Sequence, residues 1–365
     1  MILNAYTVLD LALVAIRLPL GLFLIVWTWR AWRGSSGLGR EGTGADAHRL
    51  LDEREGRLYL SLMAAGLLFV LNLLAWPLLY AVLQSYIPQW PGVMCIYGVT
   101  RIGVGSEGPS RFLPALLLGL QIVKPITVLF SGAWAWMYAA SRRTATNLHQ
   151  RRVAFLLVLF GATTLVDAAV EGAYMLTPKR EQFAEAGCCT APLEAELRSG
   201  RFAPSSWSTT RTGWLTGAFV VANLLLACLL GLQARNPLGA GPGAWLVLLT
   251  LATLAIPLNL IFFKEVASPQ ILRLEYHHCL YDLFVRAPES LVGAGFWIGG
   301  VYSTAWAWLT AMAEGRSSAQ RRDGERAEAA SGRATSGMLT SGLLTAGALG
   351  YLGCVIHFSV ALVLV

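Results

Sequence analysis

The sequence predicts an all-α polytopic membrane protein, a bundle of about eight transmembrane helices. Hydrophobic residues make up 55% of its 365 residues and charged residues only 13%, and the mean hydropathy is +0.56. Soluble domains carry about 25% charged residues, so this composition excludes a soluble enzyme and a disordered chain. The apolar residues are also grouped in blocks of about 20, the length that crosses a bilayer as a helix.

Eight apolar segments are long enough to be spans. They cover 7–33, 58–86, 113–139, 153–176, 213–234, 243–263, 290–313 and 338–365. No basic residue precedes the first apolar run, so we do not expect a signal peptide there. The whole chain, 1–365, is interpreted as a single transmembrane domain.

Arginines accumulate after the first, third and seventh spans, and this distribution predicts the orientation. The residues are Arg30, Arg33, Arg40, Arg142, Arg143, Arg151, Arg152, Arg316, Arg321, Arg322, Arg326 and Arg333. The positive-inside rule places them in the cytoplasm. Both termini and the loops 87–112, 177–212 and 264–289 are then extracytoplasmic, in the cytoplasmic (inner) membrane of a bacterial-type cell. The polar stretch 314–337 is interpreted as a flexible cytoplasmic linker.

The net charge of +7 is interpreted as topology charge, because many of the basic residues lie in loops. A nucleic-acid surface needs a basic patch on a folded domain, and no loop is long enough to form one. The expected partners are therefore the lipid bilayer and other membrane subunits, and not nucleic acid.

A weak internal repeat links the two halves of the chain. Residues 95–99 read Cys-Ile-Tyr-Gly-Val and residues 279–283 read Cys-Leu-Tyr-Asp-Leu, and the following spans contain Ala-Trp-Ala-Trp at 133–136 and 305–308. Four spans separate the two copies, which predicts a parallel 4+4 repeat. The alternative is a belt of interfacial tryptophans plus a chance pentapeptide, since Trp27 and Trp29 show the same spacing.

Four of the six cysteines fall in the predicted outer loops: Cys95, Cys188, Cys189 and Cys279. Outside is an oxidising compartment, so two structural disulfides that tie the loops into a cap are the simplest interpretation. A strained, reducible Cys188–Cys189 bond is the redox alternative. The cysteine placement resembles that of quinone-linked membrane disulfide-forming proteins. The sequence lacks their C-x-x-C motif and has more spans, so nothing is carried over from that family.

Histidine and cysteine near the outer face also suggest a metal or haem site. The candidate ligands are His277, His278, Cys279, Cys95 and His357. Histidine with cysteine suits zinc or copper, and Met94 would favour copper(I). Non-covalent haem with histidine ligands fits as well, whereas the absence of C-x-x-C-H excludes covalent haem. The sequence does not choose among copper, zinc and haem.

Polar residues inside the spans form a predicted layer in the outer half of the bilayer. They are Arg17, Lys124, Asp167, Glu171 and Asn223, with His357 close by. The helical rise places Arg17, Lys124 and Asp167 roughly 13 to 16 Å below the outer helix ends. Spans three and four are joined by a short loop, so Lys124 and Asp167 are expected to meet. The layer is interpreted as paired charges that fix helix register, as a proton or anion pathway, or as a polar pocket.

Three functional hypotheses follow. The favoured one is redox chemistry or metal or haem handling by the outer Cys/His cluster above the polar layer. The second is a transporter or channel that uses Arg17, Lys124, Asp167 and Glu171. The third is an accessory subunit of a larger membrane complex with structural disulfides. Whether the protein is an enzyme stays open, as does its substrate.

Overall fold

The computed structural model describes most of the chain and is 91% helical, with no strand in the part that it describes. The described residues are 4–37, 45–90, 93, 95–100, 102–104, 107–141, 147–179, 209–237, 241–274, 278–318 and 326–364. The chain forms two compact units. Unit 1 contains Met1–Trp90 and Thr100–Ala184, and unit 2 contains Pro91–Val99 and Glu185–Val365.

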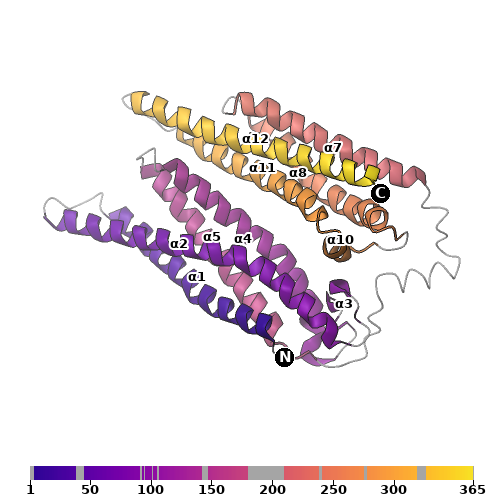
Figure 1. The fold of residues 1–365 in the computed structure, drawn as a ribbon. Helices are drawn as coiled ribbons and strands as arrows, with labels where there is room; N and C mark the ends of the chain where they lie inside the picture. Colours follow the sequence, from indigo (N-terminus) through magenta and orange to yellow (C-terminus); the bar gives the residue numbers. More distant parts are fainter. Residues whose placement is uncertain are drawn as a thin grey trace. The chain divides into compact units, whose positions relative to one another are not determined.

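Unit 1 is built from four long helices. They are α1 (Ala5–Gly37), α2 (Ala45–Tyr86), α4 (Leu113–Ser141) and α5 (Asn147–Leu176). Helix α1 packs along α2 and α5, and α4 packs along α5 (Figure 1). The connection from α2 to α4 contains two 3₁₀ turns, η1 (Ile87–Gln89) and η2 (Gly108–Phe112), and the short helix α3 (Ile96–Thr100), of which all but the last residue belongs to unit 2.

Unit 2 also has four long helices. They are α7 (Thr209–Arg235), α8 (Pro242–Phe262), α11 (Ser290–Ser318) and α12 (Arg326–Leu364). Helix α12 packs along α11 and α7, and α7 packs along α8 (Figure 1). Between α8 and α11 lie a π-helical turn, η4 (Phe263–Ala267), and the short helices α9 (Ser268–Ile271) and α10 (Leu280–Arg286).

Seven helical segments of the described chain are long and apolar enough to cross a membrane. They are Ala5–Arg30, Tyr59–Gln89, Gly108–Ala139, Val153–Leu176, Thr212–Arg235, Pro242–Ile271 and Gly337–Leu364. These helices expose apolar side chains such as Leu9 and Leu22 and bury polar ones such as Arg17 and Asn259, the reverse of a soluble protein. The chain therefore has the architecture of an all-α multi-pass membrane protein, as predicted.

The predicted span 290–313 falls in α11, which is not among those seven segments. At 29 residues, α11 is long enough to cross a bilayer. Its sequence mixes Gly, Ser, Thr, Trp and Tyr with the aliphatic residues, which lowers its hydropathy. Residues 314–318 and 326–337 of the predicted linker belong to α11 and α12.

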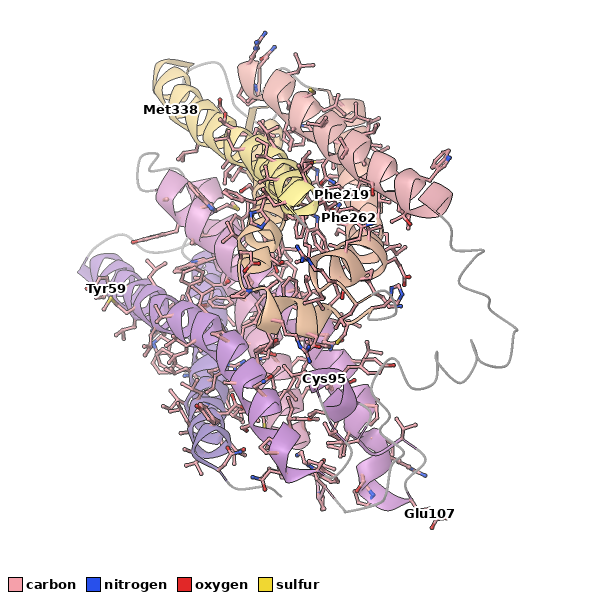
Figure 2. All side chains as sticks on the ribbon, turned by 45° about the vertical axis from the view of Figure 1, so that its right-hand side comes forward. Tyr59, Cys95, Glu107, Phe219, Phe262 and Met338 are labelled. Atoms are coloured by element: carbon pink, nitrogen blue, oxygen red, sulfur yellow. The ribbon has the colours of Figure 1, made fainter. Side chains whose placement is uncertain are left out.

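Aromatic side chains fill the interior of unit 2. Phe219 and Phe262 lie side by side in unit 2 (Figure 2), and their rings stack with centroids 3.8 Å apart. Phe358 of α12 packs edge-on against both rings, and Trp297 of α11 packs edge-on against Phe263. All of these side chains are buried, so they join α7, α8, α11 and α12 through apolar contacts.

Glycines let the helices of unit 1 approach closely. A Cβ atom at Gly161 of α5 would lie 2.8 Å from Cγ1 of Ile25 and 3.1 Å from the carbonyl oxygen of Gly21. Small residues at such crossings allow tight backbone packing where lipid provides no hydrophobic driving force between helices. The crossing holds α1 and α5 together close to the polar residues described next.

Candidate functional site

Four ionisable side chains from three helices of unit 1 meet in one buried group. Arg17 of α1 donates to Asp167 and, at 2.5 Å, to Glu171, both on α5. The Nζ atom of Lys124, on α4, lies 3.3 Å from Asp167 and 2.8 Å from Glu171. None of the four side chains is more than 4% exposed. We call Arg17, Lys124, Asp167 and Glu171 the ionic cluster.

Helix geometry explains why these residues meet. Asp167 and Glu171 are four residues apart on α5, so their side chains share one face of the helix. Helices α1 and α4 both pack against α5 and bring one cation each to that face. The sequence predicts the approach of Lys124 to Asp167 and places Arg17 at a similar depth, and the structure brings all three together.

Two uncharged side chains extend the cluster to α2. Arg17 donates through Nε to the Oδ1 atom of Asn72 at 3.0 Å, and Asn72 donates through Nδ2 to Thr164 at 3.0 Å. Thr164 lies one turn before Asp167 on α5. Asn72 was not predicted as part of this layer, although an amide inside the apolar run of the second span is an available signal. Its hydrogen bonds fix the orientation of the guanidinium group, which Asp167 and Glu171 hold from the other side.

Asp10 is a further buried carboxylate that the sequence analysis missed. It lies on α1, two turns before Arg17, and its exposed fraction is 0%. Neither of its carboxylate oxygens has a hydrogen-bond partner among the described residues. It interacts electrostatically with Glu171 and Lys124. Buried polar groups are normally hydrogen-bonded, so an unsatisfied carboxylate needs an explanation.

Counting the buried charges inside the spanning segments of unit 1 shows an imbalance. Asp10, Asp167 and Glu171 provide three carboxyl groups, whereas Arg17 and Lys124 provide two cations. A net charge is expensive inside a membrane, and a group without a counter-ion normally takes up a proton. One proton held among the three carboxyl groups would make this region neutral.

Asn223 and His357, which were predicted in the same layer, belong to unit 2. Asn223 of α7 donates through Nδ2 to Asn259 of α8 at 3.1 Å. The His357 ring of α12 packs edge-on against Phe358 with centroids 5.4 Å apart. Its Nε2 atom is buried and has no hydrogen-bond partner among the described residues.

The cysteines give no support to the predicted disulfide cap. Cys95 and Cys279 are buried, where α3 and α10 begin, and Cys228 and Cys354 lie in α7 and α12. These four form no disulfide in the described part of the chain. Cys188 and Cys189 lie outside the described residues, so their predicted pairing stays a prediction.

A metal site also finds no support in the described ranges, where no three residues of the types His, Cys, Asp and Glu are placed to hold one ion. His278 instead lies 3.2 Å from Glu265, through Nδ1, and this carboxylate also lies 3.1 Å from Lys264. His277 and Met94 fall outside the described residues. The ligand set His277, His278, Cys279, Cys95 and His357, and the copper, zinc or haem it would hold, stay predictions.

Lys179 follows the end of α5 and is buried outside the spanning segment. Its ammonium group donates to the carbonyl oxygen of Tyr174 at 2.9 Å, and it lies 4.6 Å from the ring of Tyr174 and 5.3 Å from the ring of Tyr86. Burial lowers the pKa of Lys179 from 10.5 to about 8. Between these two values the unfolded chain binds more protons than the folded one, so stability rises with pH there.

We therefore expect Lys179→Met to gain stability over the native chain at pH 7 and to lose part of that gain as the pH rises from 8 to 10. The measurement is the thermal unfolding midpoint of both proteins in detergent at each pH. Lys264→Met is the matched control, because the Lys264 side chain is 55% exposed. A difference between Lys179→Met and the native chain that is constant over this pH range would contradict the prediction.

Comparison with known proteins gives no guide to this site. No family model, curated protein or solved structure matches the chain. The ionic cluster and its surroundings are therefore the features from which a function can be inferred.

Proposed function

We propose that the chain is a membrane transport protein that moves protons through unit 1, with the ionic cluster as its working site. The observation that carries the proposal is the buried network of Arg17, Lys124, Asp167 and Glu171. Ionisable side chains within spans are rare, and those that occur mark ion and proton pathways. The excess of carboxyl groups over cations makes the proton the ion that this site is best suited to exchange.

The alternative explanation is that the charges only fix the packing of the helices. Unit 2 argues against it. In unit 1 the first long helix, α1, packs along the second, α2, and the fourth, α5, and the third, α4, packs along α5. In unit 2 the first long helix, α7, packs in the same way along α8 and α12, and the third, α11, packs along α12. Within the described part of unit 2, the ion pairs lie after α8 and each includes a side chain that is at least 20% exposed: Lys264 with Glu265 at the end of the span Pro242–Ile271, His278 with Glu265, and Arg286 with Asp282.

We infer from this shared order that the chain is a parallel 4+4 repeat, with α11 as the eighth span. Two further features support the repeat. Arg17 and Asn223 occupy the first helix of each unit, and each donates to an asparagine of the second helix, Asn72 or Asn259. The related pentapeptides 95–99 and 279–283 both follow the second helix and carry a buried cysteine at the start of a short helix.

Because of the repeat, the side chains that hold the helices together can be compared between unit 2 and unit 1. The same helix pairings are held in unit 2 by stacked phenylalanines and an Asn–Asn pair. This arrangement of helices therefore does not need a buried ionic network to form. The charges of unit 1 are then best explained by function.

Even numbers of spans put both termini on one side of the membrane. The arginine distribution along the sequence places that side outside the cytoplasm. We adopt this orientation, in which the start of α1 and the end of α5 face outward.

Proton flux in reconstituted vesicles tests the proposal without knowledge of any further substrate.

The experiment uses purified full-length protein in lipid vesicles that contain a pH-sensitive dye, with a potassium diffusion potential to drive proton entry. We expect acidification faster than in protein-free vesicles. Glu171→Gln removes a proton-accepting group and is expected to lower the rate by about 100-fold, or to the protein-free level. Glu265→Gln is the matched control, since Glu265 lies in η4 of unit 2, and it is expected to keep the native rate.

Two results would overturn the proposal: a native flux no faster than that of protein-free vesicles between pH 5 and 8, or an equal flux in Glu171→Gln. Size-exclusion chromatography of each variant before reconstitution separates a lost pathway from a misfolded protein.

A further inference from the structure

Asp10 lies between the ionic cluster and the end of unit 1 at which α1 begins. Thr7, Asp10 and Arg17 recur at spacings of three and seven residues, which puts them on one face of α1, and Asn4 directly precedes the helix. The same face carries the buried Val14 between Asp10 and Arg17. Asn4 is partly exposed, whereas Thr7, Asp10 and Arg17 have exposed fractions of 0%.

Hydrogen bonds connect Thr7 to the partly exposed end of this face. Its hydroxyl group lies 3.1 Å from the side-chain oxygen of Asn4 and 3.1 Å from the hydroxyl group of Tyr86 on α2. Asn4 in turn donates to Ser85 at 2.8 Å. Hydroxyl groups can donate and accept at the same time, so Thr7 and Tyr86 can pass a proton between them, and this chain ends one helical turn before Asp10 on α1.

We propose that Asp10 is the carboxyl group that takes up the transported proton from this end of the molecule and passes it to Glu171. This inference rests on the proposed function and adds the residue at which the proton enters. Asp10 accepts one proton to become a neutral carboxylic acid and returns to the carboxylate when Glu171 accepts that proton. No other reactant is needed.

The surroundings of Asp10 suit this role. The ionisable groups that interact with it are Arg17 on its own helix, Lys124 on α4, and Asp167 and Glu171 on α5, and α2 contributes the hydroxyl group of Tyr86. Arg17 and Lys124 are already paired with Asp167 and Glu171. Asp10 is the carboxylate without a hydrogen-bonding partner among the described residues, so a proton neutralises it without breaking an ion pair.

Labelling by dicyclohexylcarbodiimide tests the inference without requiring flux. This apolar reagent enters membranes and forms an adduct with protonated carboxyl groups, because the acid adds across a C=N bond of the reagent. The full-length protein in lipid vesicles is labelled between pH 5 and 9 and the adducts are located by mass spectrometry. We expect an adduct on Asp10 whose rate of formation falls as the pH rises.

Variants separate this inference from the proposed function. Asp10→Asn is expected to lose the adduct and at least about 100-fold in proton flux, and Asp10→Glu to regain both in part. Tyr86→Phe removes a hydroxyl group from the entry chain and is expected to slow the flux while Asp10 still forms the adduct. If Asp10→Asn keeps native flux while Glu171→Gln loses it, this inference is wrong and the proposed function stands.

Three labelling results would also overturn the inference. They are the absence of an adduct on Asp10 at every pH, a labelling rate independent of pH, and protection of Asp10 by sodium ions, which would indicate a metal-cation site. If both Asp10→Asn and Glu171→Gln keep native flux, the proposed function fails as well.

Discussion

Replacement of Arg17 by methionine is expected to destabilise the protein by about 3–5 kcal/mol, the range measured when one partner of a buried ion pair is removed. Arg17 donates to Asn72, Asp167 and Glu171 at once, so its loss leaves two carboxylates with Lys124 as their shared cation. The unfolding free energy can be measured by reversible titration with a denaturing detergent in mixed micelles.

Two controls make this result specific. Arg235→Met removes an exposed arginine at the end of α7 and is expected to change the unfolding free energy by less than about 0.5 kcal/mol. Adding Glu171→Gln to Arg17→Met removes one of the stranded carboxylates and is expected to recover part of the lost stability. Equal stabilities of Arg17→Met and Arg235→Met would contradict the network as described.

Much of the ionic cluster was predictable because depth in a membrane follows from position along the helix. The rise per residue gives Arg17, Lys124 and Asp167 similar depths, and the short loop between the third and fourth spans makes α4 and α5 neighbours. Depth does not determine lateral position, however. Asn223 and His357 share the predicted depth but belong to unit 2, which a single sequence does not reveal.

Asp10 and Asn72 were missed for different physical reasons. Asp10 lies only a few residues into the first span, where a charge is expected to reach the interface, and only the packing of the helices around it makes it buried. Asn72 has no charge and so stands out little from an apolar run. Its importance comes from the arginine that it meets across the helix interface.

The outer cysteines show the limit of arguments from sidedness. The arginine distribution assigns Cys95 and Cys279 to the same side of the membrane, which is necessary for a shared site but says nothing about distance. Both residues belong to unit 2 and are buried at the starts of the short helices α3 and α10, at matching places in the two pentapeptides. The equivalence of the two positions follows from the proposed repeat, and a shared site at Cys95 and Cys279 stays a prediction.

Substitution of Gly350 by alanine is the second change with a large expected effect. A Cβ atom there would lie 2.6 Å from the carbonyl oxygen of Phe296, 2.7 Å from the amide nitrogen of Gly300 and 2.8 Å from its Cα atom. All three atoms belong to the backbone of α11, so the helices have to move apart. We expect Gly350→Ala to destabilise the protein by about 1–3 kcal/mol, the usual effect of overpacking.

Gly342→Ala on the same helix is the matched control, because a Cβ atom at Gly342 meets nothing within 4 Å. Both variants gain the same helix propensity, so the difference between their unfolding free energies measures the close contact alone. If Gly350→Ala matches Gly342→Ala, α11 and α12 do not cross at this glycine, and the packing of α11 along α12, on which the shared helix order of the two units depends, is contradicted at this point.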